Sequence, residues 1–132
     1  MKALLLTLAA IAAPAAAQAP NWSKAQTISI TMTDHGFVPR NIPVRRDGFY
    51  VLRVTNRSGK GHNLTQKSFF ANARIAPQDR GWVRDGQIVL NSGERASVRL
   101  QAPATRPGGT YQFTSTTLGD ADDDYKGVFL IR

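Results

Sequence analysis

The residues of this chain best suited to bind a metal ion are its two histidines, His35 and His62, and an acidic run near the C-terminus. The run, "DADDDYKG", begins at Asp120 and includes Asp122. Imidazole combined with carboxylate suits Cu(II), Ni(II) or Zn(II). One hypothesis is therefore a mixed site of both histidines with one or two of these aspartates. The alternatives are a structural His62 hydrogen-bonded to a loop carbonyl, an exposed turn residue at His35, and a solvated acidic loop that could dock a basic partner.

The chain has no cysteine. It therefore lacks a thiolate metal ligand, a disulfide and an attachment point for a lipid anchor. A catalytic serine also finds no support, because Ser115 has no histidine near it in sequence and no glycine-rich nucleophile elbow appears. We expect a protein that is not an enzyme.

The N-terminus has the three parts of a secretory signal peptide. Met1-Lys2 is positive, "ALLLTLAAIAA" is apolar, and "PAAAQAP" supplies small residues for cleavage. We expect removal of residues 1–17 and export of 18–132 as one domain, to a bacterial periplasm or, alternatively, by secretion. The apolar run is too short to span a membrane, and no later segment is apolar and long enough to do so.

The formal net charge is +8. The basic residues are scattered along the sequence and form no dense run, so nucleic acid is a poor candidate partner. A basic exported protein is suited to an acidic periplasmic protein or an anionic surface. The alternative is that the charge serves solubility alone.

Most of the chain alternates apolar and polar residues with period two. The segments "TISITM", "FYVLRVT", "RASVRLQ" and "TYQFTS" show this pattern, and "GVFLIR" closes the chain as an apolar run. Glycine, proline, asparagine and aspartate separate them, which is typical of a β-sandwich of antiparallel strands. Residues 65–86 break the pattern and are expected to be irregular or briefly helical, with Phe69 and Phe70 plugging the sandwich.

Simple traversal of the first strands places the two histidines together. A strand at 26–33 runs one way, a strand at 40–46 returns, and a strand at 49–55 runs forward again into the loop 56–62. His35 follows the first strand and His62 follows the third, so both should lie at the same end of the sandwich.

The order of these segments resembles the cupredoxin family, the small blue-copper β-sandwiches. "FVPRNIPVRRDGFYVLRVTN" is similar to the family's opening, and "GKGHNL" to its first copper histidine followed by an asparagine that ties two ligand loops together. "QIVLNSGERASVRLQAP" resembles the middle strands, and "GGTYQFTS…YKGVFLIR" the ligand strand, ligand loop and last strand. The resemblance covers nearly all of residues 18–132. It implies an all-β, Greek-key sandwich of about seven to eight strands.

The resemblance also implies which residues occupy the ligand positions. His62 matches the first histidine. Ser115 stands at the cysteine, Leu118 at the second histidine and Tyr125 at the axial methionine. A blue-copper site needs a trigonal set of two histidines and one thiolate, with methionine as the weak member. A neutral hydroxyl and a leucine cannot replace these ligands.

We therefore predict a repacked site without type 1 copper. Strand parity points Ser115 inward, and Leu118 and Tyr125 are expected to fill the former cavity with apolar volume. No cofactor is expected, and the protein is interpreted as a non-catalytic binding module. The alternatives are a copper or other metal-binding protein that uses His62, His35 and the acidic loop, and, less in keeping with the residues, an electron carrier.

Overall fold

The structure, a computed structural model, describes residues 20–120 and 124–132. The predicted signal peptide, residues 1–17, and Asp122 lie outside the described residues. Ten strands and short helices make up this part of the chain. The strands are β1 (Gln26–Thr33), β2 (Gly36–Val38), β3 (Asn41–Val44), β4 (Phe49–Asn56), β5 (His62–Thr65), β6 (Arg74–Ile75), β7 (Gln87–Leu90), β8 (Arg95–Gln101), β9 (Thr110–Thr114) and β10 (Lys126–Ile131). The helices are α1 (Lys67–Asn72) and the 3₁₀ turns η1 (Trp22–Lys24) and η2 (Pro77–Trp82).

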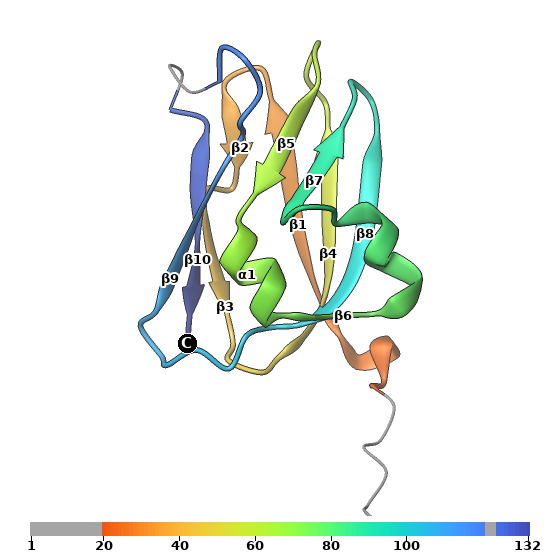
Figure 1. The fold of residues 1–132 in the computed structure, drawn as a ribbon, viewed down its shortest axis with the longest axis vertical. Coiled ribbons are helices and arrows are strands. Elements are labelled where there is room, and N and C mark those ends of the chain that lie inside the picture. Colours follow the sequence, from red (N-terminus) through yellow and green to blue (C-terminus); the bar gives the residue numbers. More distant parts are fainter. Residues whose placement is uncertain (1–19, 121–123) are drawn as a thin grey trace, which may run out of the picture.

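The strands form two five-stranded sheets that face each other as a sandwich (Figure 1). Sheet A has the order β2-β1-β4-β8-β6, and sheet B has the order β3-β10-β9-β5-β7. The predicted all-β sandwich is confirmed. The structure has ten strands rather than the predicted seven to eight, because short segments such as β2 and β6 form their own pairings with β1 and β8.

Two of the pairings are parallel, which the sequence-based expectation of antiparallel strands missed. β1 pairs with β4 in parallel, and β3 pairs with β10 in parallel. The reason is that β2 and β3, which together return the chain after β1, belong to different sheets. β4 therefore comes back beside β1 in the same direction.

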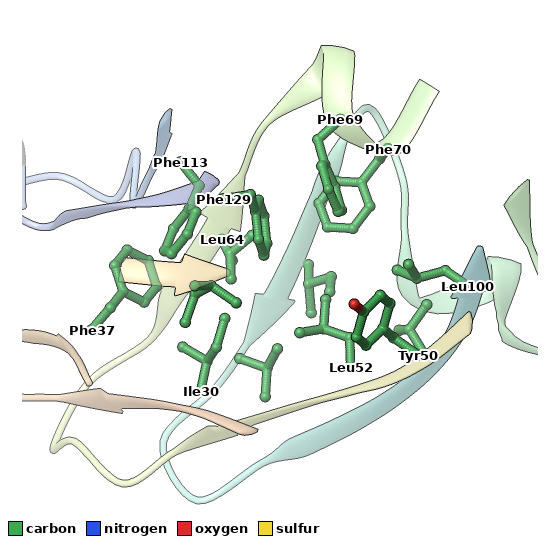
Figure 2. Packing of buried hydrophobic residues seen from close by; sticks show 14 of the residues in the cluster. Ile30, Phe37, Tyr50, Leu52, Leu64, Phe69, Phe70, Leu100, Phe113 and Phe129 are labelled. Atoms are coloured by element: carbon green, nitrogen blue, oxygen red, sulfur yellow. The ribbon is translucent and has the colours of Figure 1, made fainter. Parts of the chain in front are cut away.

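Alternation along the strands builds the core between the sheets. Ile30 of β1 and Leu52 of β4 point inward from sheet A, and Phe113 of β9 and Phe129 of β10 point inward from sheet B (Figure 2). Each of these side chains is at most 1% exposed. Burying one such side chain contributes about 1.5–3 kcal/mol, so this layer holds the two sheets together.

The excursion at 65–86 is partly helical, as predicted. Helix α1 starts where the side chain of Gln66 accepts hydrogen bonds from the next turn, and it carries Phe69 and Phe70 into the core. Figure 2 shows both rings directed between the sheets, with Phe69 stacked on Phe129 at 4.1 Å between ring centroids. Within the described residues, no helix is long and apolar enough to cross a membrane.

The loops that follow β1, β4 and β9 gather at one end of the sandwich, the top of Figure 1. The parallel register of β1 and β4 ends at Met32 beside Asn56, so the turn with His35 and the loop before His62 are neighbours. Asp34 Oδ1 accepts a hydrogen bond of 2.8 Å from the Gly59 N–H, which joins the two segments. This end of the molecule is the one that the strand-traversal argument selected.

Candidate functional site

His62 is the first residue of β5, and its imidazole is enclosed at the loop end of the core. It is 1% exposed, and its ring stacks on that of Tyr125 with 4.4 Å between centroids and 19° between planes. Tyr125 in turn packs edge-on against Phe37. The histidine therefore has an aromatic wall on one face and little freedom to rotate.

A single carboxylate oxygen connects this histidine to the loop that follows β9. Asp120 Oδ2 lies 2.5 Å from His62 Nδ1 and 2.5 Å from Ser115 Oγ. All three side chains are at least 97% buried. Ser115 is buried as strand parity predicted, and it donates its hydroxyl proton to Asp120.

The carboxyl group of Asp120 is ionised despite its burial. Burial raises its pKa, but the hydrogen bonds from Ser115 and His62 and the favourable charge interactions with His62 and Lys60 together lower the pKa below its ordinary value. Lys60 Nζ lies 3.5 Å from the second oxygen, Oδ1, as a charge partner that makes no hydrogen bond. Because the carboxylate only accepts, the imidazole proton must sit on Nδ1.

Asn63 fixes the start of the loop after β9. Its Oδ1 accepts the Thr116 N–H at 3.0 Å, and its Nδ2 donates to Thr116 Oγ1 at 3.0 Å. Its backbone N–H also donates to Ser115 Oγ at 3.2 Å. This is the role that the family resemblance implied for the asparagine after the first histidine.

Tyr125, which the resemblance placed at the axial ligand, stacks its ring on His62 and directs its hydroxyl to the backbone. Its hydroxyl donates to the Thr33 carbonyl at 2.6 Å. Burial, followed by the negative charges of Asp120 and Asp34, raises the pKa of this phenol. It therefore stays protonated at neutral pH and offers no phenolate ligand.

Two expectations about the loop were wrong. Leu118 does not fill the former cavity, since it is 97% exposed. The acidic run is not wholly solvated, since Asp120, 1% exposed, turns inward. The reason is that Thr116 is tied to Asn63, and the turn that follows directs residue 118 outward and residue 120 back toward the core.

The other predicted metal ligands do not converge on His62. His35 is exposed in the turn between β1 and β2, and Asp122 lies outside the described residues. In residues 20–120 and 124–132, no three histidine, cysteine, aspartate or glutamate side chains gather as a metal site. His62 and Asp120 form the one pair of predicted ligands that the described residues bring into contact.

The residues present do not fit a type 1 copper ion. The thiolate position carries a neutral hydroxyl, the second histidine position points into solvent, and the axial position is an engaged phenol. The remaining imidazole uses Nδ1 for Asp120. A hydroxyl and one imidazole do not provide the trigonal sulfur–nitrogen set that such a copper ion requires.

Serine, aspartate and histidine also occur in hydrolytic sites, but here their order differs. In a catalytic triad, histidine lies between serine and aspartate and removes the serine proton. In this chain, Asp120 lies between Ser115 and His62, and both donate to it. The arrangement holds a loop against the core and differs from a triad in that the imidazole does not contact the serine hydroxyl.

Sequence reasoning missed two supporting residues. Lys60 balances Asp120 from the neighbouring loop. Asn56, fully buried, organises that loop by donating to the Lys60 carbonyl at 2.9 Å and the Leu90 carbonyl at 3.0 Å. The sequence signal that could have indicated Asn56 was its place as the polar last residue of a largely apolar strand.

No protein-family model matches this sequence, and no curated protein does. Solved structures do match. Auracyanin B superposes with a TM-score of 0.58 at 20% identity, over 82% of this chain and 89% of that one. A dithionite-reduced auracyanin from the photosynthetic bacterium Roseiflexus castenholzii superposes with a TM-score of 0.59 at 19% identity, over 82% of this chain and 98% of that one.

Auracyanin is a cupredoxin, and the fold of this chain is cupredoxin-like. At these identities the likeness defines the fold alone. Within that fold, the described residues place one carboxylate oxygen of Asp120 beside both His62 and Ser115.

Proposed function

We propose that this chain is a non-catalytic binding module in which Asp120 does the structural work that a bound metal ion does in a blue-copper protein. The observation that carries the proposal is the position of Asp120 Oδ2, at 2.5 Å from both His62 Nδ1 and Ser115 Oγ. One negative oxygen thereby joins the β5 strand to the loop after β9. The module then keeps its loop end rigid without a metal.

Metal dependence of stability tests this proposal. Purified chain is unfolded by denaturant in EDTA, and again with Cu(II) or Zn(II) in stoichiometric amount. The proposal predicts the same midpoint in all three conditions, because Asp120 already binds His62 Nδ1 and Ser115 Oγ. A midpoint that falls in EDTA or rises with either metal would contradict it, since a ligand that binds only the native state stabilises that state.

Export to the periplasm is part of the same proposal. It is supported by the signal-like residues 1–17. The full chain would be expressed in a Gram-negative bacterium and its osmotic-shock fraction examined by mass spectrometry. Recovery there of a chain that begins at Gln18 supports export, and an intact chain confined to the cytosol argues against it.

A metal-binding protein is the second candidate, and one observation favours it. His62 Nε2 and Asp120 Oδ1 are buried, and neither has a hydrogen-bond partner among the described residues. Buried polar atoms without partners can mark a place for an ion or a water molecule. Imidazole and carboxylate together are suitable ligands for Cu(II) or Zn(II).

Calorimetric titration separates the two candidates. Cu(II) and Zn(II) are titrated into the wild type, His62→Gln and the matched control His35→Gln, with circular dichroism to verify that each variant is folded. Micromolar or tighter binding that is lost only in His62→Gln supports the metal-binding candidate. Absent binding, or binding that is equal in all three proteins, rejects it.

A further inference from the structure

The outer face of sheet A collects arginines that are far apart in the sequence. On β4 the inward residues Leu52 and Val54 are buried, so Arg53 and Thr55 face out. On β8, Ala96 and Val98 are likewise buried. Arg95, Ser97 and Arg99 therefore share that outer face.

Two of these arginines have no acidic partner among the residues that the structure describes. Arg99 is neutralised by Asp79, with 2.8 Å between Nε and Oδ2. Neither Arg53 nor Arg95 forms an ion pair or a side-chain hydrogen bond with any residue in 20–120 or 124–132. The outward positions of β1, β4 and β8 supply no acidic side chain that could balance them.

The strand register brings the two unpaired arginines close together. Arg53 is opposite Ser97 and Thr55 is opposite Arg95, so the arginines are diagonal neighbours on one face. Diagonal side chains in a sheet are within reach of each other when they are long. Two like charges at such a distance repel each other. The repulsion between Arg53 and Arg95 is relieved if an anion lies between them.

The surface between them is hollow and lined by hydroxyl groups. A pocket of about 280 Å³ is lined by Arg53, Thr55, Arg95, Ala96 and Ser97. Guanidinium groups bind phosphate through paired hydrogen bonds, and hydroxyl groups add further donors. The outer positions of β3, β9 and β10 on the opposite side of the sandwich hold one charged side chain, Lys126, which pairs with Asp124 at 3.1 Å.

We infer that Arg53 and Arg95, with Thr55 and Ser97, form a binding site for a phosphate group on the outer face of sheet A. The phosphate is supplied either by a small soluble anion or by the headgroups of an anionic membrane. This inference rests on the proposed function only in that the module acts by binding. The site is separate from His62 and Asp120, so either idea can fail while the other stands.

Backbone-amide NMR with inorganic phosphate tests the inference, with chloride at equal ionic strength as reference. The proteins are the wild type, Arg53→Gln/Arg95→Gln, and the charge-matched control Arg84→Gln/Arg106→Gln, whose arginines are exposed and lie outside the β4 and β8 strands. In the wild type and the control, we expect saturable shifts confined to residues 53–55 and 95–97. In Arg53→Gln/Arg95→Gln, affinity should fall by about tenfold or more, because both charged donors are lost.

Stability in the absence of phosphate provides a second readout. The Arg53→Gln/Arg95→Gln protein should be folded and no less stable than the wild type, because the substitutions remove a like-charge pair. Phosphate should then raise the melting temperature of the wild type and not that of this variant. Shifts spread evenly over all arginines, or equal phosphate effects on the two double variants, would overturn the inference.

Vesicles distinguish the source of the phosphate. Co-sedimentation is measured with vesicles of phosphatidylglycerol and phosphatidylcholine in equal amounts, and with phosphatidylcholine alone. Binding to the anionic vesicles that decreases with salt and requires Arg53 and Arg95 assigns the site to a membrane surface. Binding of free phosphate without vesicle binding assigns the site to a soluble anion. If the protein binds neither free phosphate nor the anionic vesicles, the inference is overturned.

Discussion

His62 Nδ1 lies 2.5 Å from Asp120 Oδ2, although the two residues are 58 positions apart in the sequence. The contact joins the first residue of β5 to the loop that follows β9. Both side chains are almost fully buried, so the contact is shielded from water and salt. Its loss should therefore affect the whole loop end of the sandwich.

Removing the charge of Asp120 should destabilise the fold. In Asp120→Asn, the amide replaces an ionised acceptor that faces two donors, and we expect a loss of about 2–4 kcal/mol in the free energy of unfolding. The matched control is Asp124→Asn in the same loop, where the side chain is 64% exposed and surface ion pairs are worth at most about 1 kcal/mol. Urea unfolding of both variants measures the difference, and equal losses would contradict the assigned role of Asp120.

Acid should weaken the fold through the same carboxyl group. Because the pKa of Asp120 is lowered in the folded state, its contribution is complete above the ordinary value of 3.8 and is lost as the pH falls through the lower, folded-state value. Urea unfolding between pH 6 and pH 2 should show a steeper loss of stability in the wild type than in Asp120→Asn. Parallel profiles would show that Asp120 does not couple protonation to folding.

Leu118 and Tyr125, which flank the part of the loop outside the described residues, should respond differently to substitution. Leu118→Ser should change stability by less than about 0.5 kcal/mol, because Leu118 is 97% exposed. Tyr125→Phe keeps the ring stacked on His62 and removes the bond to the Thr33 carbonyl, for an expected loss of about 1 kcal/mol. Thermal unfolding checks both values, and a large loss in Leu118→Ser would mean that its side chain is buried.

Strand parity correctly predicted which side chains at the end of β9 point into the core. Alternation along "TYQFTS" placed Phe113 and Ser115 inward, and both are buried. The loop after Ser115 has no such period, so neither the exposure of Leu118 nor the burial of Asp120 was encoded in a pattern. These orientations depend on tertiary hydrogen bonds, chiefly from Asn63, which a single sequence does not specify.

The charge distribution shows the same limit. Arg53 and Arg95 look scattered in the sequence because 41 other residues lie between them in the chain. The pairing of β4 with β8 nevertheless makes them neighbours on the sheet. Strand pairing is a long-range property, so period-two reasoning could assign each arginine to an outer face but not place the two together. The surface site therefore emerged only from the register.

Substituting cysteine at Ser115 and histidine at Leu118 should not create a blue-copper centre. In Ser115→Cys/Leu118→His, residue 118 still points into solvent and Asp120 still occupies His62 Nδ1. Turning residue 118 inward would break the bonds between Asn63 and Thr116. After addition of Cu(II), we expect no intense thiolate charge-transfer absorption in the visible spectrum. Its appearance would show that the loop rearranges readily.

The state of the His62 ring tests the central claim most directly. Nitrogen-15 NMR of the imidazole would report which ring nitrogen carries the proton and whether Zn(II) displaces it. The account predicts a proton on Nδ1, shifted downfield by its bond to Asp120, lost in Asp120→Asn, and unchanged when one equivalent of Zn(II) is added to the wild type. Loss of that proton signal with a shift of Nδ1 on addition of Zn(II) would show that a metal replaces Asp120 at His62, and would contradict the account.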